Sequence, residues 1–162
     1  MWMENTSDTL YEEICSGSKL TAPDKLPLTE RPDRREIAAW GEVLVKKYLE
    51  QLAQDAASGI KQIIWLNEDQ ERALPYDLII LMATGKSGLD TEEVYVEVKA
   101  TESDDKAFFE ISSQQFEFAQ QVKERYHIYR VFSAGKSHVR LSRLINLAEK
   151  MKTKQVQLFL VV

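Results

Sequence analysis

The chain has 162 residues, of which 44% are hydrophobic and 9% aromatic, so it is long enough for one domain with a proper core and too short for two. No run approaches the roughly 18 apolar residues of a membrane span, and the N-terminus lacks the basic start and apolar stretch of a signal peptide. With a single cysteine, Cys15, that cannot form an internal disulfide, we expect a soluble intracellular protein, nuclear or cytoplasmic.

The charge of the chain is divided unevenly along its length. The net charge of -5 argues against a protein built to coat nucleic acid, but residues 121–162 hold nine Lys or Arg against two Glu. This basic end can face phosphate, and a solvated basic surface explains it equally well. The candidate phosphate contacts are Lys123, Arg125, Arg130, Lys136, Arg140 and Arg143.

The first predicted element is a helix that follows an irregular start. Residues 1–33 carry three prolines and no regular apolar spacing, which indicates a flexible arm or linker before a domain at 34–162. Helical spacing over 34–57 predicts a helix. Glu42 lies within its apolar stripe, which is formed by Ala38, Val45, Leu49 and Leu52.

The rest of the chain alternates between strand and helix patterns. Three segments rich in β-branched and aromatic residues, 61–68, 75–83 and 92–100, predict an antiparallel meander with a hairpin turn at 85–88. A helix, a strand, a helix and a strand are expected next, at 112–126, 127–134, 144–151 and 156–162. This order favours an α/β fold with a mixed sheet flanked by helices.

The segment EEVYVEVKAT at 92–101 separates a core face from a chemical face. Alternate residues of a strand share a face, so the three valines point one way while Glu97 and Lys99 point the other. Asp77 begins the preceding strand and is expected to meet Glu97 and Lys99 at one edge of the sheet. A helix packed over that edge would deliver Glu42 as a third acid.

Converging carboxylates with a lysine beside them suit phosphodiester cleavage. Carboxylate oxygens bind hard divalent cations such as Mg²⁺ or Mn²⁺, and without a cation two such groups would repel each other. A lysine can orient or activate the attacking water and offset charge on phosphate. Simpler roles stay open: a surface ion pair for Glu97 and Lys99, an exposed helix position for Glu42 and a turn for Asp77.

These residues resemble a known group of enzymes, the PD-(D/E)XK nuclease superfamily, which includes restriction endonucleases and Holliday-junction resolvases. Within it, the sequence over 35–162 is similar to the C-terminal domain of NO VEIN proteins, a domain often attached to larger ATPase- or helicase-containing chains. The phrases that carry this resemblance are GEVLVKKYL, WLNEDQERALPYDLII, YVEVKAT, FFEISSQQFEFA and YHIYRVF.

The resemblance implies a restriction-endonuclease-like fold and a magnesium-dependent endonuclease that cleaves DNA. It implies Glu42, Asp77 and Glu97 as metal-binding acids and Lys99 as the residue that orients or activates water. Two departures from the pattern are the tyrosine between proline and aspartate in Pro75-Tyr76-Asp77, and Gln115 where the branch often carries Glu. The spacing from Ser112 also makes Gln115 a candidate helix cap.

A second hypothesis is that the chain has the same fold but does not catalyse a reaction. A catalytically silent member would use the basic end or the former active cleft to bind nucleic acid or a protein partner. The proline-bearing start also suits a linker to other domains of a longer chain.

Overall fold

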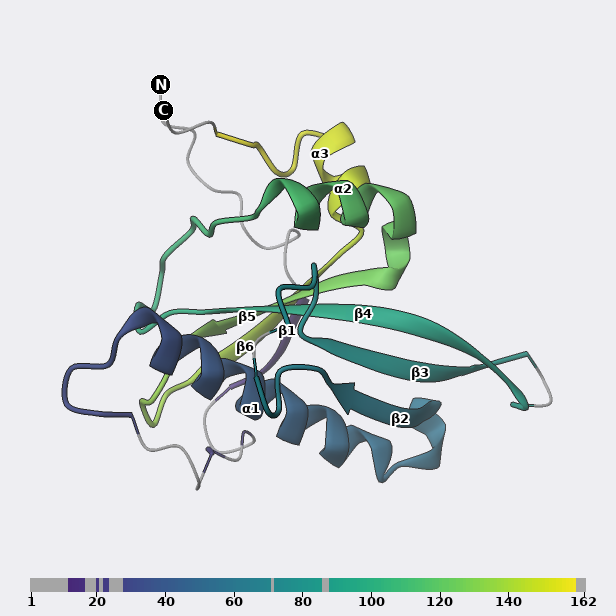
Figure 1. Cartoon of the computed structure of the whole chain (residues 1–162), viewed down its shortest axis with the longest axis horizontal. Helices are drawn as coiled ribbons and strands as arrows, with labels where there is room; N and C mark the ends of the chain where they lie inside the picture. The colour runs from purple at the N-terminus through teal and green to yellow at the C-terminus, as the bar shows by residue number, and fades with distance from the viewer. Residues whose placement is uncertain are drawn as a thin grey trace.

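A six-stranded sheet forms the centre of the protein in the computed structural model, which describes residues 12–16, 20, 22–23, 28–70, 72–85 and 88–159 (Figure 1). Helices cover both of its faces. The strands are β1 (Glu12–Ser16), β2 (Ile60–Trp65), β3 (Leu78–Thr84), β4 (Asp90–Ala100), β5 (Tyr126–Phe132) and β6 (Arg140–Ile145). The α-helices are α1 (Arg34–Ala53), α2 (Ser113–Val122) and α3 (Leu147–Lys152), with 3₁₀ turns η3 (Ala56–Ser58) and η4 (Lys123–Arg125).

The sheet is mixed, as predicted. Its strand order is β1-β6-β5-β4-β3-β2, and β4 and β5 form its parallel pair. β2, β3 and β4 form the expected antiparallel meander, in which Thr84 pairs with Asp90 across the hairpin. Residues 86 and 87 of the expected turn lie outside the described part of the chain.

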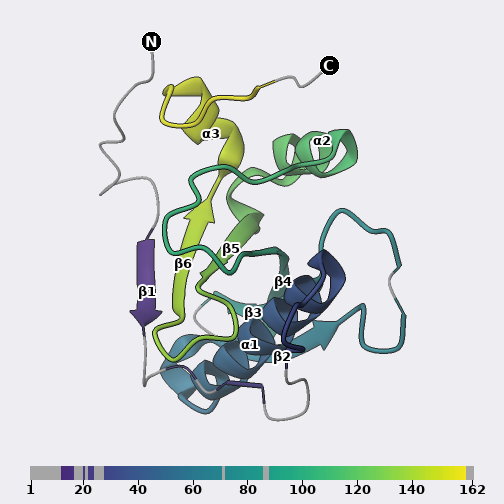
Figure 2. The ribbon, with the colours of Figure 1, turned by 90° about the vertical axis from the view of Figure 1, so that its left-hand side faces the viewer.

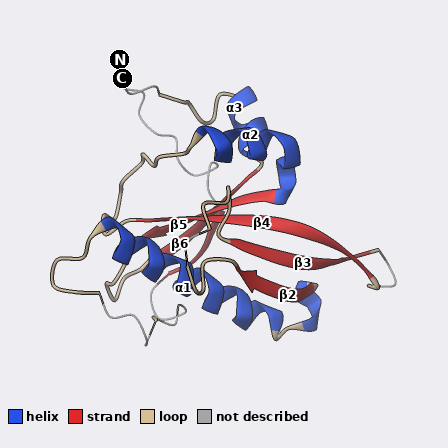
Figure 3. Cartoon of the chain, viewed as in Figure 1, coloured by secondary structure: helices blue, strands red, loops and turns tan. Residues whose placement is uncertain are grey.

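Two apolar clusters lie on opposite faces of the sheet. Figures 2 and 3 show α1 on one side, and α2 and α3 together on the other. The valines of β4 pack in the cluster under α1, whereas Tyr95 packs in the cluster under α2 and α3. The valines therefore share one face as predicted, but the opposite face, expected to be the chemical one, is also part of a core at Tyr95.

Helix α1 is positioned by its cap and by one glycine. The Asp33 side chain accepts hydrogen bonds from the backbone N–H groups of Arg35 and Glu36, which satisfies two free donors at the helix start. A Cβ atom at Gly41 would lie 2.6 Å from the Ala100 Cβ, so only glycine permits this approach to β4. Val45 and Leu49 of the predicted stripe are buried, as expected.

The structure corrects the predicted elements at several points. The first helix ends at Ala53 rather than at 57, and Ala38 and Leu52 are exposed instead of belonging to the buried stripe. Two strands were not predicted: β1, within the segment assigned to an arm, and β6, within the basic segment. No strand forms over 156–159, and 160–162 lie outside the described residues. None of the described helices is long and apolar enough to cross a membrane.

Candidate active site

Asp77 is held at the sheet edge by backbone hydrogen bonds. Its N–H donates to the carbonyl of Val96 at 2.8 Å, and its carboxylate Oδ2 accepts from the N–H of Val98 at 2.8 Å. Since the register pairs Leu78 with Val96, Asp77 lies opposite Glu97. The sequence-predicted meeting of these two acids is present, and Asp77 is more than a turn residue.

Glu42 reaches this edge from α1. Its Oε2 accepts hydrogen bonds from the indole Nε1 of Trp65 at 2.8 Å and from the Asn67 amide Nδ2 at 3.3 Å. The same Nδ2 donates to Asp77 Oδ1 at 2.9 Å. Asn67 therefore joins the acid of the helix to the acid of the sheet, and Glu42 is not an exposed helix residue.

Glu97 and Lys99 form a half-enclosed ion pair. Their Oε1 and Nζ atoms are 2.8 Å apart, and Glu97 is only 4% exposed, so this is not the surface pair that was one reading of the spacing. Gln115 binds both: its Nε2 donates to Glu97 Oε1 at 2.7 Å, and its Oε1 accepts from Lys99 Nζ at 3.2 Å.

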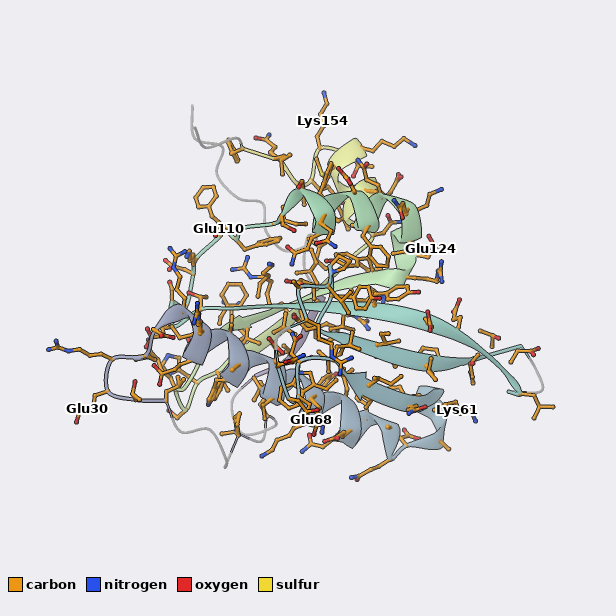
Figure 4. The ribbon with its side chains drawn as sticks, in the orientation of Figure 1. Glu30, Lys61, Glu68, Glu110, Glu124 and Lys154 are labelled. Atoms are coloured by element: carbon orange, nitrogen blue, oxygen red, sulfur yellow. The ribbon has the colours of Figure 1, made fainter. Side chains whose placement is uncertain are left out.

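Gln115 is also the predicted cap of α2. Its Oε1 accepts from the N–H of Ser112, and its own N–H donates to the Ser112 hydroxyl, which is a reciprocal capping box. In Figure 4, the labelled Glu110 and Glu124 mark the two ends of the segment that holds α2. The start of this helix is therefore tied directly to Glu97 and Lys99.

Burial and mutual repulsion raise the pKa values of the acids. The pKa of Asp77 is raised to about 8, chiefly by desolvation and then by the nearby charges of Glu97 and Glu42. Desolvation also raises the pKa of Glu97, and its hydrogen bond and charge interaction with Lys99 oppose this effect. The pKa of the Tyr126 hydroxyl rises too, from its burial and from the charges of Glu97 and Asp77.

The donor set fits a hard cation. The second carboxylate oxygen of Glu97, Oε2, is buried and has no hydrogen-bond partner among the described residues. Oxygen ligands with spare negative charge are what Mg²⁺ and Mn²⁺ prefer. Within the described ranges, no three His, Cys, Asp or Glu side chains are already placed to hold a metal together, so the acids would need to draw closer.

The predicted basic residues do not form one surface. Lys123 and Arg125 lie just before β5, and Lys136 and Arg140 lie beyond its other end. The latter two donate to the backbone carbonyls of Glu102 and Asp104. The basic set is therefore divided by the length of a strand, while Arg143 is half-buried in β6.

Arg130 is a correction to the predicted phosphate contacts. It is 1% exposed, donates to the carbonyl of Lys106 at 2.8 Å, and places its guanidinium over the rings of Phe109 and Phe132 at 4.6 and 4.9 Å. Such a side chain supports the 106–109 segment through cation–π contacts. It is not available to a nucleic-acid backbone.

Two residues of the site were not found from the sequence. Asn67 and Trp65 both donate to Glu42, and they flank the end of β2. The spacing of a strand cannot show that the residues after it fold back onto a helix. The sequence signals were the polar Asn-Glu-Asp run at 67–69 and the place of both residues in the phrase WLNEDQERALPYDLII.

The sequence matches the family described as Protein NO VEIN, C-terminal, over residues 41–144. Among curated proteins, Protein NO VEIN-LIKE of Arabidopsis thaliana is 37% identical over 106 residues, which is 65% of this chain and 15% of that protein. Protein NO VEIN of the same organism is 40% identical over 67 residues, which is 41% of this chain and 2% of that protein. The chain thus spans a small part of both relatives, and no solved structure gives a significant match.

Proposed function

Because the chain belongs to the family defined by the C-terminal domain of Protein NO VEIN, we propose that it is a divalent-cation-dependent endonuclease domain that hydrolyses phosphodiester bonds in nucleic acid. The predicted family is confirmed, and the wider nuclease superfamily stays a prediction. DNA is the first substrate to test, because the motif Asp77 and Glu97-Val98-Lys99 resembles that of DNA-cleaving enzymes.

One observation carries the proposal: four residues chosen from the sequence meet at one sheet edge. Asp77 and Glu97 lie opposite each other, Glu42 is joined to Asp77 through Asn67, and Lys99 is paired with Glu97. Glu42 comes from α1, Glu97 from β4, and Asp77 from the residue directly before β3. Perturbed carboxylates gathered in this way are typical of functional sites.

Each residue has a distinct task in this proposal. Glu42, Asp77 and Glu97 would hold Mg²⁺ or Mn²⁺, which supplies Lewis-acid polarisation of the phosphate and of the attacking water. Lys99 is fixed by Glu97 and Gln115, so its ammonium can orient that water and offset charge on the phosphate. Water attacks phosphorus in line with the ester oxygen that leaves.

A second candidate function is a catalytically silent module that binds nucleic acid or a protein partner within a longer chain. This function is supported by side-chain amides that already donate hydrogen bonds to the acids. Asn67 donates to Glu42 and Asp77, and Gln115 donates to Glu97. The division of the basic residues between two ends of β5 also weakens the case for a single cleavage groove.

Calorimetry and cleavage assays distinguish the two. Mg²⁺ or Mn²⁺ is titrated into the wild type, Asp77→Ala and the exposed control Asp90→Ala, while single-stranded, duplex and branched substrates are tested in the same buffers. The nuclease proposal expects cation binding and cutting that Asp77→Ala abolishes and Asp90→Ala keeps. Absence of both from the wild type would sink it, and nucleic-acid binding that survives Asp77→Ala would favour the silent module.

A further inference from the structure

Asn67 lies between two acids that the proposed function assigns to a cation. It lies two residues after the end of β2, next to Glu68, which Figure 4 labels. The amide Nδ2 donates to Asp77 Oδ1 at 2.9 Å and to Glu42 Oε2 at 3.3 Å. One neutral donor thus bridges carboxylates that come from different elements.

The orientation of this amide is set by a third hydrogen bond. Its carbonyl oxygen Oδ1 accepts from the backbone N–H of Arg72, at 3.2 Å, within the same loop. Turning the amide over would place its oxygen against both carboxylates and its NH₂ group against another donor. The donor side of Asn67 therefore faces the acids.

In this position, an amide N–H group partly replaces the positive charge that a cation would place between the acids. It places partial positive charge between two half-buried acids whose proximity helps to raise the pKa of Asp77, and hydrogen bonds to an acid are stronger when its oxygen is ionised. A cation bound by the same oxygens needs their lone pairs and the space between them. The amide and the cation consequently compete.

We propose that Asn67 is a positioning residue that holds Glu42 and Asp77 together in the cation-free protein and withdraws its amide from both when a divalent cation binds. The inference rests on the proposed function, since it requires that these acids bind a cation. Withdrawal also breaks or shifts the hydrogen bond from the backbone N–H of Arg72, which links cation binding to the position of the chain at Arg72.

The test uses Mn²⁺ alone as the probe, with calorimetry and thermal unfolding of the full chain. Asn67→Ala should lower the Tm of the cation-free protein and yet tighten Mn²⁺ binding by about tenfold, roughly the 1.4 kcal/mol of one hydrogen bond to a charged group. A merely structural residue would lower the Tm without tightening binding. Asn67→Ser serves the same purpose if the alanine variant does not fold.

The matched control is Asn146→Ala. Asn146 caps α3 by accepting from the N–H of Glu149, so its loss should lower the Tm and leave Mn²⁺ affinity unchanged. Equal or weaker binding by both Asn67 variants would overturn the inference while leaving the proposed function intact. No Mn²⁺ binding by the wild type would overturn both.

Discussion

Asp77 is the acid of the site whose pKa is raised to near neutrality. Burial and the charges of Glu97 and Glu42 raise its pKa to about 8, against the lowering effects of the Val98 N–H and of Lys99. Without a cation, it is therefore largely protonated at neutral pH. Because a ligand carboxylate must be ionised, cation binding at this site should release a proton and strengthen as the pH rises.

The same shift predicts how stability depends on pH. A carboxyl group whose pKa is raised by folding, here from 3.8 to about 8, contributes stability below the lower value that is lost as the pH rises through the upper one. Asp77→Asn cannot ionise. In the presence of chelator, the Tm of this variant should therefore improve relative to the wild type between about pH 5 and pH 8.

The size of this gain follows from the shift. Each pKa unit corresponds to about 1.4 kcal/mol, so the relative gain should reach several kcal/mol at the upper end. The variant loses one acceptor for Val98 or Asn67, but that loss does not vary with pH and leaves the slope of the difference unaffected. Tm curves that run parallel over the whole range would show that Asp77 keeps an ordinary pKa in the folded protein.

Among the elements, α1 places its acid because it lies unusually close to β4. Glycine within a helix is destabilising by roughly 0.5–1 kcal/mol, yet Gly41 is buried against Ala100, and the next residue is Glu42. The close approach carries Glu42 to the indole of Trp65. A helix one methyl group further from the sheet would hold this carboxylate away from Asp77.

Gly41→Ala tests that reasoning. The new methyl group overpacks the contact with Ala100, which should cost about 1–3 kcal/mol, only partly offset by the better helix propensity of alanine. Cation affinity should also fall, because Glu42 moves. Calorimetry and thermal unfolding measure both effects.

The double variant Gly41→Ala with Ala100→Gly is the control. It removes the Cβ atom that the new methyl group would meet, so cation affinity should recover towards the wild-type value. If the single variant binds cation as well as the wild type does, the helix position does not set the site.

At the scale of the whole molecule, residue spacing predicted features that depend on neighbours in the sequence, but not pairings between distant segments. Alternation along β4 was enough to place Glu97 and Lys99 on one face, and the acid in the apolar stripe of α1 correctly pointed to Glu42. Strand β1 was not predictable in this way, since its partner is β6, more than 120 residues later. Its pairing also occupies the outer edge of β6, where a final strand could otherwise have joined the sheet.

The composition likewise showed how many basic residues the C-terminal part of the chain contains, but not where they lie in the folded protein. Arg125 is near the site, since its guanidinium lies 5.9 Å from the ring of Tyr95, two residues before Glu97. Lys136 and Arg140, at the other end of β5, are engaged with the 102–104 loop. Lys136 and Arg140 are therefore held on backbone carbonyls, whereas Arg125 lies over an aromatic ring.

This arrangement predicts unequal effects of two variants that remove the same charge. If the domain binds nucleic acid at the site, Lys123→Ala with Arg125→Ala should weaken binding and lower the salt slope by up to about 2, since each phosphate contact contributes about 0.9. Lys136→Ala with Arg140→Ala should leave the slope nearly unchanged and loosen the 102–104 loop. Fluorescence anisotropy of a labelled duplex across a salt series measures the slope. Equal losses from both variants would mean that overall charge, rather than the segment that holds Lys123 and Arg125, governs binding.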